Sequence, residues 1–459
     1  MSKYRAYNIK DKKVLIIGTG KSGKAAVQAM AKLGAEVYVQ DNKKEEDVDP
    51  QLVVFLKEKS VKCYWGKEPE DMSIFDILIL SPGVSPELPF IKEAENSGAE
   101  IIGELEIAYR VGRGNYVAIT GTNGKTTTTT LVGEIYKAAG RETHVVGNIG
   151  VAVISKALSD GDDSWMITET SSFQLETTKE FRPEISAILN LTPDHMDRHK
   201  TMQRYIDAKA QIFKNQDKKQ YCVMNYDDEK CRELFENCNA KPVPFSRLHE
   251  LDFGAYVKNN NIVVKDGEGK IFEICRTQEL NIPGAHNLEN ALAACAIAYF
   301  GGIDKDIIAK VLREFRGVEH RIEICNEIDG IKFVNDSKGT NPDASIKAVE
   351  AMKKNIILIA GGFDKNSSYD EFVKSFDGKV KALVLMGATA AKIKKAAEKA
   401  GFTNSVILKD MEECVREAYR IAQPGDIVLL SPACASWDMY TSFEQRGNHF
   451  KSCVRALER

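Results

Sequence analysis

Short apolar runs of strand length alternate along the chain with stretches in which apolar residues recur at helical spacing. This alternation is typical of parallel β-sheets covered by helices, because each strand of such a sheet is buried on both faces. The clearest runs fall at residues 14–17, 36–39, 77–80, 165–168 and 185–189, with another that ends at 119. Further runs follow at residues 221–224, 262–264, 356–360, 382–386 and 427–430. The pattern therefore predicts an α/β fold.

The spacing of these runs divides the chain into three blocks. A chain of 459 residues is long enough for about three domains that each bury a core. We predict a Rossmann-like N-terminal domain over residues 1–102 and a central P-loop ATPase-type α/β domain over residues 103–317. A C-terminal Rossmann-like α/β domain is expected over residues 318–459, with hinges around Gly103 and near Gly317.

Composition narrows the class of protein. The chain has 63 basic and 66 acidic residues, so nothing indicates a surface for nucleic acid or for an anionic membrane. No apolar run approaches the roughly 20 residues of a membrane span, and the run at 14–17 predicts a strand rather than a signal peptide. Ten cysteines are scattered without a C-x-x-C pair, which favours reduced thiols and no zinc ribbon. We expect a cytoplasmic monomer.

A phosphate-binding loop is predicted directly after the run that ends at 119. It reads Gly121-Thr122-Asn123-Gly124-Lys125-Thr126-Thr127 and leads into a helix. Backbone N–H groups and the positive helix end can hold phosphates, Lys125 can reach the outer ones, and Thr126 can bind Mg²⁺. Ile119 stands where the common G-x-x-x-x-G-K-[ST] motif has its first glycine, and the compressed form is typical of one group of ATP-dependent ligases. The alternative is a plain turn, but Lys-Thr after a buried strand favours ATP binding.

The first block contains a second glycine-rich turn. Gly18-Thr-Gly20-Lys-Ser-Gly23 follows a strand-like run and satisfies G-x-G-x-x-G, with Asp41 near the end of the next run. Three interpretations are open: a nicotinamide dinucleotide with Asp41 on its ribose, a UDP-linked substrate, or a tight strand–helix turn. The turn at residues 81–84 could close over the other end of a nucleotide. A separate ATP loop, and no hydride-transfer constellation downstream, favour the UDP-linked substrate.

The central block also carries candidate metal ligands. Glu169 ends a buried run, and a carboxylate there can hold the Mg²⁺ that Thr126 also touches. His195 and His199 are four residues apart, but the glutamate of H-E-x-x-H is missing and Pro193 favours a loop or a first turn. We predict that His195 binds metal and that His199 is an exposed neighbour. On composition alone, Lys209 is an ordinary solvated helix residue.

In the third block, polar turns follow several of the expected strands. They lie at residues 335–341, 361–365 and 430–438, and His320 and Arg321 stand at the start of the block. Because the carboxyl ends of parallel strands meet at one edge of a sheet, we expect these turns to form a crevice. Lys338 and Lys365 should make that crevice attractive to an anion.

Together these motifs resemble the Mur ligase family, in order and over essentially the whole chain. They are G-T-N-G-K-T-T, E-T-S-S-F-Q-L-E, D-H-M-D-R-H, P-G-x-H-N-x-x-N, H-R-I-E, N-D-S-K-G-T-N, G-G-x-D-K and S-P-A-C-A-S-W-D with F-E-Q-R-G. The last is the most specific, and it separates members that add D-glutamate from those that add alanine, a diamino acid or a dipeptide. Folylpolyglutamate ligases share the ATP loop but usually lack a nucleotide-binding block at the N-terminus.

The resemblance implies an ATP-dependent amide ligase that adds D-glutamate to UDP-N-acetylmuramoyl-L-alanine through an acyl phosphate. It implies ATP contacts from Gly121, Thr122, Asn123, Gly124, Lys125, Thr126, Thr127, Asn287, Asn290, Arg321 and Asp336. Two Mg²⁺ ions, or Mn²⁺ in their place, would be bound by Thr126 and Glu169 and by His195 and Lys209. The Lys209 amine would be carboxylated. Catalysis would depend mainly on Lys125, Glu169, His195 and Lys209.

The same resemblance implies the substrate contacts. The UDP-linked substrate would meet Ser22, Asp41, Asn42 and Gly83, with Asn148 and Ser171 contacting substrate or nucleotide. D-glutamate would be held by Thr340, Lys365, Ser436 and Phe443. His320 is a candidate base for the attacking amine. A nucleotide-dependent regulatory switch, which would use the ATP loop without an amino-acid crevice, is the other alternative to be excluded.

Overall fold

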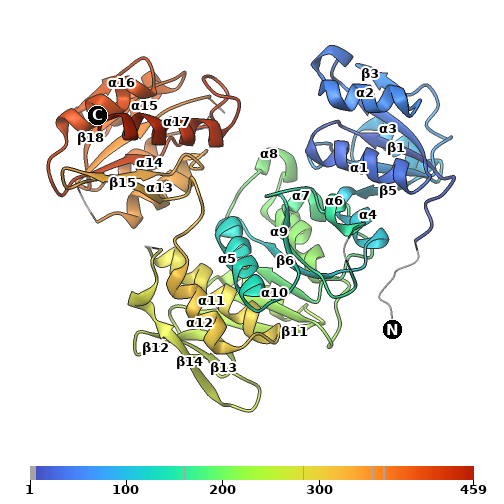
Figure 1. Cartoon of the computed structure of the whole chain (residues 1–459), viewed down its shortest axis with the longest axis horizontal. Helices are drawn as coiled ribbons and strands as arrows, with labels where there is room; N and C mark the ends of the chain where they lie inside the picture. Colours follow the sequence, from blue (N-terminus) through green and yellow to red (C-terminus); the bar gives the residue numbers. More distant parts are fainter. Residues whose placement is uncertain (1–6, 160, 283, 354, 365–366, 459) are drawn as a thin grey trace. The chain divides into compact units, whose positions relative to one another are not determined.

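The computed structural model describes residues 7–159, 161–282, 284–353, 355–364 and 367–458. It contains three β-sheets flanked by helices (Figure 1). The chain divides into two compact units, Met1–Glu279 with Glu289–Arg313, and Leu280–Leu288 with Glu314–Arg459. The first unit holds two sheets and the second unit holds one. This is the three-domain α/β fold that the sequence predicts, and the unit boundary after Arg313 lies close to the hinge expected near Gly317.

The first sheet is parallel throughout, with strand order β3-β2-β1-β4-β5. Its strands are β1 (Lys13–Ile17), β2 (Glu36–Asp41), β3 (Lys62–Trp65), β4 (Ile77–Leu80) and β5 (Glu100–Gly103). Its helices are α1 (Lys21–Lys32), η1 (Glu45–Asp47), α2 (Pro50–Glu58) and α3 (Pro89–Asn96). The strand order reverses between β1 and β4, so the turns that follow these two strands lie together at a switch point.

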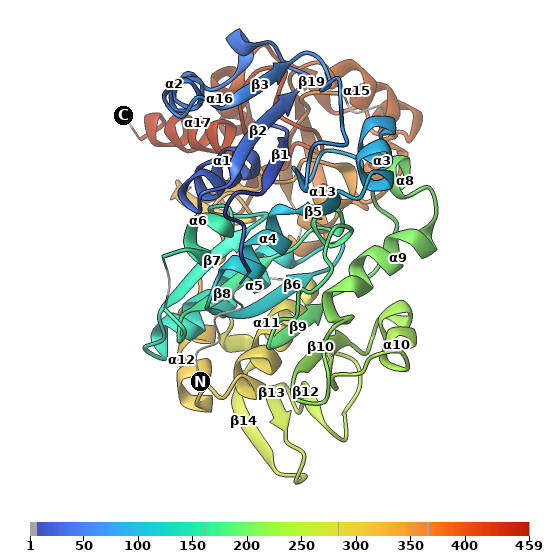
Figure 2. The same ribbon diagram turned by 90° about the vertical axis from the view of Figure 1, so that its right-hand side faces the viewer.

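The middle sheet has nine strands in the order β14-β13-β12-β11-β10-β9-β6-β8-β7. They are β6 (Asn115–Thr120), β7 (Thr143–Gly147), β8 (Trp165–Glu169), β9 (Ile185–Ile188), β10 (Tyr221–Asn225), β11 (Lys241–Ser246), β12 (Gly254–Lys258), β13 (Asn261–Lys265) and β14 (Ile271–Arg276). The last three pair antiparallel. Figure 2 shows this meander at one edge of the sheet.

The helices of this block are α4 (Glu104–Val111), α5 (Lys125–Ala138), α6 (Ile154–Ala157), α7 (Ser172–Leu175), α8 (Met196–His199), α9 (Met202–Ala210), η2 (Gln211–Phe213), α10 (Glu229–Phe235), η3 (Thr277–Glu279), α11 (Ala285–Phe300) and α12 (Lys305–Glu314). Helices α5 and α11 lie side by side (Figures 1 and 2), and Thr128 Oγ1 donates to Asn290 Oδ1 at 3.3 Å. One apolar cluster runs from β1 through α4 to β6 and includes Ile16, Leu105 and Tyr116. The first two sheets therefore share a core.

The third sheet has the order β15-β16-β20-β17-β18-β19 and is parallel except for the edge strand β15. Its strands are β15 (Glu323–Ile328), β16 (Ile331–Asn335), β17 (Ile356–Ala360), β18 (Val380–Leu385), β19 (Ser405–Ile407) and β20 (Ile427–Leu430). Its helices are α13 (Pro342–Ala351), α14 (Asp370–Lys374), α15 (Ala390–Lys399), α16 (Met411–Ile421) and α17 (Phe443–Ala456). Successive residues of β17 enter opposite cores, Leu358 one and Ile359 the other, because strand side chains alternate between faces.

Two further features concern the cysteines and the hydropathy of the helices. All ten cysteines lie in the described part of the chain and are free, as expected for reduced thiols. Among the described helices, none has the length and apolar character needed to cross a membrane.

Candidate active site

The phosphate loop forms as predicted between β6 and α5. Gly121 and Gly124 adopt φ angles of 152° and 84°, and a Cβ on Gly124 would lie 2.2 Å from Asn290 Oδ1. Glycine is therefore required there by backbone conformation and by space. Lys125 Nζ donates to the carbonyl oxygens of Gly121 at 2.8 Å and Thr122 at 2.9 Å. The loop thus holds its ammonium group at the N-terminal end of α5, where a phosphate can bind.

The loop is fastened to the segment that follows β9. Asn123 N donates to Asn190 Oδ1 at 2.8 Å, and Thr122 Oγ1 lies 3.0 Å from the hydroxyl of Tyr205. Asn190 and Tyr205 were not identified by the sequence analysis. Asn190 could have been predicted, because it is a polar residue just past β9, the strand beside β6 in the parallel sheet. Thr126 and Thr127 are buried in the first turn of α5.

Glu169 ends β8, which pairs with β6, so its side chain lies beside the phosphate loop. Its Oε1 accepts a hydrogen bond from Asn148 Nδ2 at 2.8 Å. Its Oε2 is buried and has no hydrogen-bond partner among the described residues. Leaving a carboxylate oxygen buried and unpaired is costly, and a cation bound there would remove the cost. The carboxylate therefore fits a metal ligand.

Lys209 is buried, which contradicts the interpretation from composition. It is 2% exposed, because α9 turns the face with Tyr205, Ile206, Ala208 and Lys209 inward. Its Nζ donates to Gly121 O at 2.9 Å and to Thr120 Oγ1 at 3.3 Å, and it lies 4.7 Å from the centre of the Tyr205 ring. Burial, followed by the charge of Lys125, lowers the pKa of Lys209 well below its ordinary value, while Asp194 and Glu169 oppose the shift.

The two histidines behave in opposite ways. His195 caps α8 with a left-handed φ of 53°, and its side chain is 50% exposed. His199 is 3% exposed, with Nε2 2.9 Å from Ser172 Oγ and Nδ1 3.2 Å from a Glu176 oxygen. The prediction of an exposed His199 is therefore wrong.

In the first domain, the residues expected to meet UDP lie at or just after the carboxyl ends of β1, β2 and β4. Asp41 Oδ2 accepts hydrogen bonds from Thr19 N at 2.7 Å and Thr19 Oγ1 at 2.6 Å. Burial raises the pKa of Asp41, but the bonds from Thr19 and from the Lys43 backbone outweigh it, so the net pKa is lowered. Ser22 is half-buried in α1, and Asn42 and Gly83 are exposed. The Asp41 carboxylate therefore holds the glycine-rich turn, and its oxygens already accept hydrogen bonds from the protein.

In the second unit, the buried carboxylate of Asp336 connects two turns. Oδ1 accepts from Ile322 N at 3.2 Å, and Oδ2 accepts from Ser431 Oγ at 2.7 Å. Burial raises the pKa of Asp336 to about 6, against the opposing effect of the Ser431 bond and the Arg321 charge. The Nε of Arg321 is buried without a hydrogen-bond partner among the described residues. A donor and an acceptor suited to a polar ligand thus lie close together.

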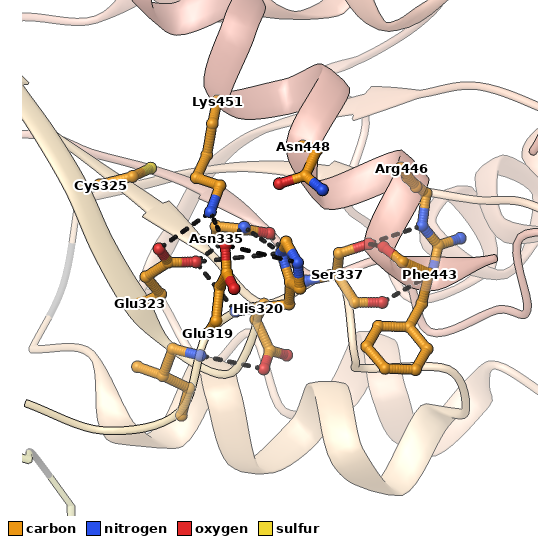
Figure 3. A network of polar contacts seen from close by, with 12 residues as sticks. Glu319, His320, Glu323, Cys325, Asn335, Ser337, Phe443, Arg446, Asn448 and Lys451 are labelled. Atoms are coloured by element: carbon orange, nitrogen blue, oxygen red, sulfur yellow. Dashed lines mark hydrogen bonds and ion pairs between the residues drawn. The ribbon is translucent and has the colours of Figure 1, made fainter. Parts of the chain in front are cut away.

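Arg446, which the sequence analysis missed, joins the turns that carry Thr340 and Ser436. Its guanidinium is 1% exposed and donates from Nε to Ser337 Oγ at 3.0 Å and from Nη2 to Ser337 O at 2.8 Å. Nη1 donates to the carbonyl oxygens of Cys434 and Ala435 at 3.1 and 3.2 Å. Ser337 Oγ in turn donates to Phe443 O at 2.8 Å (Figure 3).

Three of the four residues expected to hold D-glutamate therefore lie on segments that Arg446 fastens. They are Thr340, Ser436 and Phe443. Lys365, the fourth, lies outside the described residues. Lys338 Nζ lies 5.4 Å from the centre of the Phe443 ring. Spacing in the sequence could not identify Arg446, because its partners, apart from the Ser337 hydroxyl, are backbone carbonyls in two separate turns.

His320 is enclosed at the start of the third block. It is 3% exposed, its Nδ1 lies 2.9 Å from Asn335 Nδ2, and a Cβ on Gly447 would come within 2.3 Å of it. This enclosure argues against its use as a base for an incoming amine. Its neighbours Glu319 and Glu323 both pair with Lys451 (Figure 3). Glu319, His320 and Glu323 have the spacing of a metal site. The Lys451 ammonium already lies against both carboxylates and supplies a positive charge to them.

Three family models match the chain in order. The N-terminal domain of MurD-like Mur ligases matches residues 12–103, the Mur ligase middle domain residues 119–298, and the glutamate ligase domain of Mur ligases residues 320–434. The chain belongs to the Mur ligase family.

Named relatives extend this result over the full length. The chain is 52% identical over 456 residues to UDP-N-acetylmuramoylalanine--D-glutamate ligase of Alkaliphilus oremlandii, covering 98% of this chain and 100% of the relative. It is 49% identical over 452 residues to the ligase of the same name from Clostridioides difficile, with the same coverage. Among solved structures, MurC of Thermotoga maritima is similar with a TM-score of 0.60 at 19% identity, covering 97% of this chain and 100% of that one. At that identity the likeness is one of fold.

Proposed function

We propose that this protein is an ATP-dependent ligase that joins D-glutamate to UDP-N-acetylmuramoyl-L-alanine in peptidoglycan precursor synthesis. The observation that carries the proposal is the full-length likeness, at about half identity, to relatives that bear the name of this activity. The protein would work in the cytoplasm as a monomer and support cell shape and division. Neither nucleic acid nor membrane is expected as a partner.

The ATP site would be built on the first turn of α5. Residues Gly121 to Thr127 would surround the phosphates, with the Lys125 ammonium exchanging its loop carbonyls for phosphate oxygens. Asn287 and Asn290 at the start of α11 would contact the adenine. Arg321 and Asp336 would also contact the nucleotide, and the buried Arg321 Nε, without a hydrogen-bond partner among the described residues, supports that role.

Two divalent cations, Mg²⁺ or Mn²⁺, would complete the site. Thr126 and Glu169 would hold one, and the unpaired Oε2 of Glu169 supports this ligand set. His195 and a carboxylated Lys209 would hold the other. The cations would neutralise phosphate charge and orient the transferring group. Asn148 would fix the direction of the Glu169 carboxylate through its 2.8 Å hydrogen bond.

The two substrates would bind to the first and third domains. Ser22, Asp41, Asn42 and Gly83 would bind the UDP end of the first substrate, and Asn148 and Ser171 would contact substrate or nucleotide. Asp41 would act largely through the Gly18 turn, since its oxygens already accept bonds from Thr19. Thr340, Lys365, Ser436 and Phe443 would hold D-glutamate, and Thr340, Ser436 and Phe443 lie on the segments that Arg446 fastens.

The proposed reaction has two steps. An alanyl carboxylate oxygen attacks the γ-phosphorus of ATP, ADP leaves, and an acyl phosphate forms. The amine of D-glutamate then attacks the acyl carbon, inorganic phosphate leaves, and the amine loses a proton as the amide forms. Lys125 would stabilise the charge that develops on the transferring phosphoryl group. The buried surroundings of Glu169 and Lys209 would keep water from the acyl phosphate.

The test is phosphate release measured with a panel of UDP-muramoyl precursors and amino acids. We expect release only when ATP, UDP-N-acetylmuramoyl-L-alanine and D-glutamate are all present, and little product with L-glutamate. Release without an amino acid would favour a nucleotide-dependent switch. NADH fluorescence should not change on mixing, and a change would favour the dinucleotide interpretation of the Gly18 turn.

A further inference from the structure

Glu176, at the end of α7, holds two consecutive residues of α8 with one carboxylate. Its Oε2 accepts a hydrogen bond from Arg198 Nη2 at 2.8 Å, and its Oε1 lies 3.2 Å from His199 Nδ1. The other ring nitrogen of His199 lies 2.9 Å from Ser172 Oγ at the start of α7. Both ends of α7 are therefore joined to this single helical turn.

The residues on either side of α8 have backbone conformations that are unfavourable by themselves. His195 before it and Lys200 after it both have positive φ, 53° and 67°, which is costly for residues with a Cβ. Phe173 of α7 lies between the side chains, with ring centres 4.9 Å from His195 and 5.4 Å from His199, and the Arg198 guanidinium lies 4.7 Å from its centre. The direction of His195 thus depends on contacts made by α7.

Arg198 also reaches the first domain. The same Nη2 that meets Glu176 donates to the carbonyl oxygen of Val84 at 3.2 Å. Val84 ends the turn that follows β4 and faces the Gly18 turn across the switch point, where Gly18 lies against Ser81. The Arg198 guanidinium therefore connects the turn at residues 81–84, which is expected to meet UDP, with the helical turn α8 that follows His195.

Packing does not account for this arrangement by itself. Glu176, Arg198 and His199 line a cavity of about 540 Å³ with Ser85, Pro86 and Glu87 of the first domain. Because one side of the network faces this space, packing against Phe173 covers only part of α8, and the polar contacts to Glu176 and Ser172 contribute to holding it in place.

We propose that Glu176 is a positioning residue, which acts through Arg198 and His199 to orient His195 and to connect the metal site with the turn at residues 81–84. The inference rests on the proposed metal and UDP-substrate sites. Groups that orient a metal ligand typically change metal affinity or activity by about 10–100-fold when they are removed. Loss of the Glu176 charge should therefore weaken cation binding and UDP-substrate binding together, and leave the D-glutamate site unaffected.

The test compares Glu176→Gln and Arg198→Lys with the parent protein. Mn²⁺ binding would be followed by electron paramagnetic resonance with a non-hydrolysable ATP analogue, and binding of UDP-N-acetylmuramoyl-L-alanine by calorimetry without nucleotide. For Glu176→Gln we expect about tenfold weaker Mn²⁺ binding and about fivefold weaker binding of the UDP substrate, as for the loss of one hydrogen bond. Arg198→Lys should weaken UDP-substrate binding at least as much. The KM for D-glutamate should stay within about twofold of the parent value in both variants.

Glu87→Gln is the matched control, since it removes a carboxylate that lines the same cavity but contacts Lys92 rather than Arg198. It should leave both affinities within about twofold. The inference is overturned if Glu176→Gln binds Mn²⁺ and the UDP substrate as tightly as the parent. If Glu176→Gln fails to fold, Arg198→Lys decides, and unchanged UDP-substrate affinity in that variant overturns the connection. Failure of the parent to bind the UDP substrate would instead contradict the proposed function.

Discussion

The amine of Lys209 lies 2.9 Å from the carbonyl oxygen of Gly121, inside the phosphate loop and almost without exposure to solvent. A charged ammonium is poorly solvated there, and Lys125 adds a second positive charge. Both effects favour the neutral amine, which can attack CO₂, form a nitrogen–carbon bond and lose a proton. The resulting carbamate would offer oxygen atoms of the kind that Mg²⁺ prefers. The geometry of Lys209 thus supports its proposed carboxylation.

Lys209→Ala should reduce activity at least about 100-fold, because it removes a metal ligand at the reacting centre. Formate or acetate should restore part of the activity by filling the vacated space. Lys214→Ala, which removes an exposed lysine a few residues further along, is the control and should behave like the parent. An unmodified Lys209 in ¹³CO₂ NMR spectra or electron density of the active, metal-loaded enzyme would contradict the assignment.

Lys125→Ala should reduce turnover by about 10²–10³-fold, the usual effect of losing one charge that stabilises a transition state. UDP-substrate binding should be retained, since the Lys125 ammonium donates to carbonyl oxygens of its own loop. Lys137→Ala removes a lysine at the other end of α5 that pairs with Glu134, and it should leave turnover unchanged. Near-normal turnover of Lys125→Ala would show that the loop does not serve ATP chemistry.

Ser436→Ala should raise the KM for D-glutamate far more than the KM for ATP or for the UDP substrate. Ser436 is buried on the segment that Arg446 holds, so a hydroxyl there can donate to a bound carboxylate with little reorganisation. Ser452→Ala, on the exposed side of α17, serves as the control. Equal increases in all three KM values would indicate damage to the whole third domain instead.

Glu104→Gln should change how stability depends on pH. Glu104 is fully buried, its Oε1 accepts from Ile154 N at 2.7 Å, and its Oε2 has no partner among the described residues. Burial raises its pKa to about 7, while the bonds from Ile154 and Val153 oppose the shift. The folded state therefore binds the proton more tightly, and this contribution is complete below the ordinary pKa near 4.5 and is lost as the pH rises through about 7.

At pH 8 the glutamine variant should consequently be more stable than the parent, by on the order of 3 kcal/mol. Near pH 4 the difference should almost vanish, because the parent carboxyl is then mostly neutral in both the folded and the unfolded state. Urea unfolding of both proteins from pH 4 to 8.5 measures this. A difference in the free energy of unfolding that does not change with pH would mean that Glu104 does not titrate in that range.

Gly447→Ala should destabilise the third domain, because the new Cβ would lie 2.3 Å from Nδ1 of the enclosed His320. Overpacking of this kind typically costs about 1–3 kcal/mol, more than alanine gains over glycine in a helix, about 1 kcal/mol. The thermal unfolding midpoint should fall. Gly161→Ala, with no atom near the new Cβ, should not lower it.

Local pattern alone determined the fold class, the order of the strands along the chain and the phosphate loop. Strand burial and glycine turns are local properties, so the runs at 77–80, 356–360 and 427–430 coincide with β4, β17 and β20. The motif order also identified the family. The position of Glu169 at the end of a buried strand was predicted for the same reason.

Tertiary structure decided which side chains are enclosed and what they contact. Lys209 and His199 looked exposed because helical spacing says nothing about which face another element covers. Arg446 and Glu176 stand in the motifs F-E-Q-R-G and E-T-S-S-F-Q-L-E, but no role could be assigned to them from the sequence, because their partners are backbone carbonyls or side chains that only folding brings to them. A residue type states what chemistry is available, but only packing sets its solvation and neighbours, and these determine its charge and its direction.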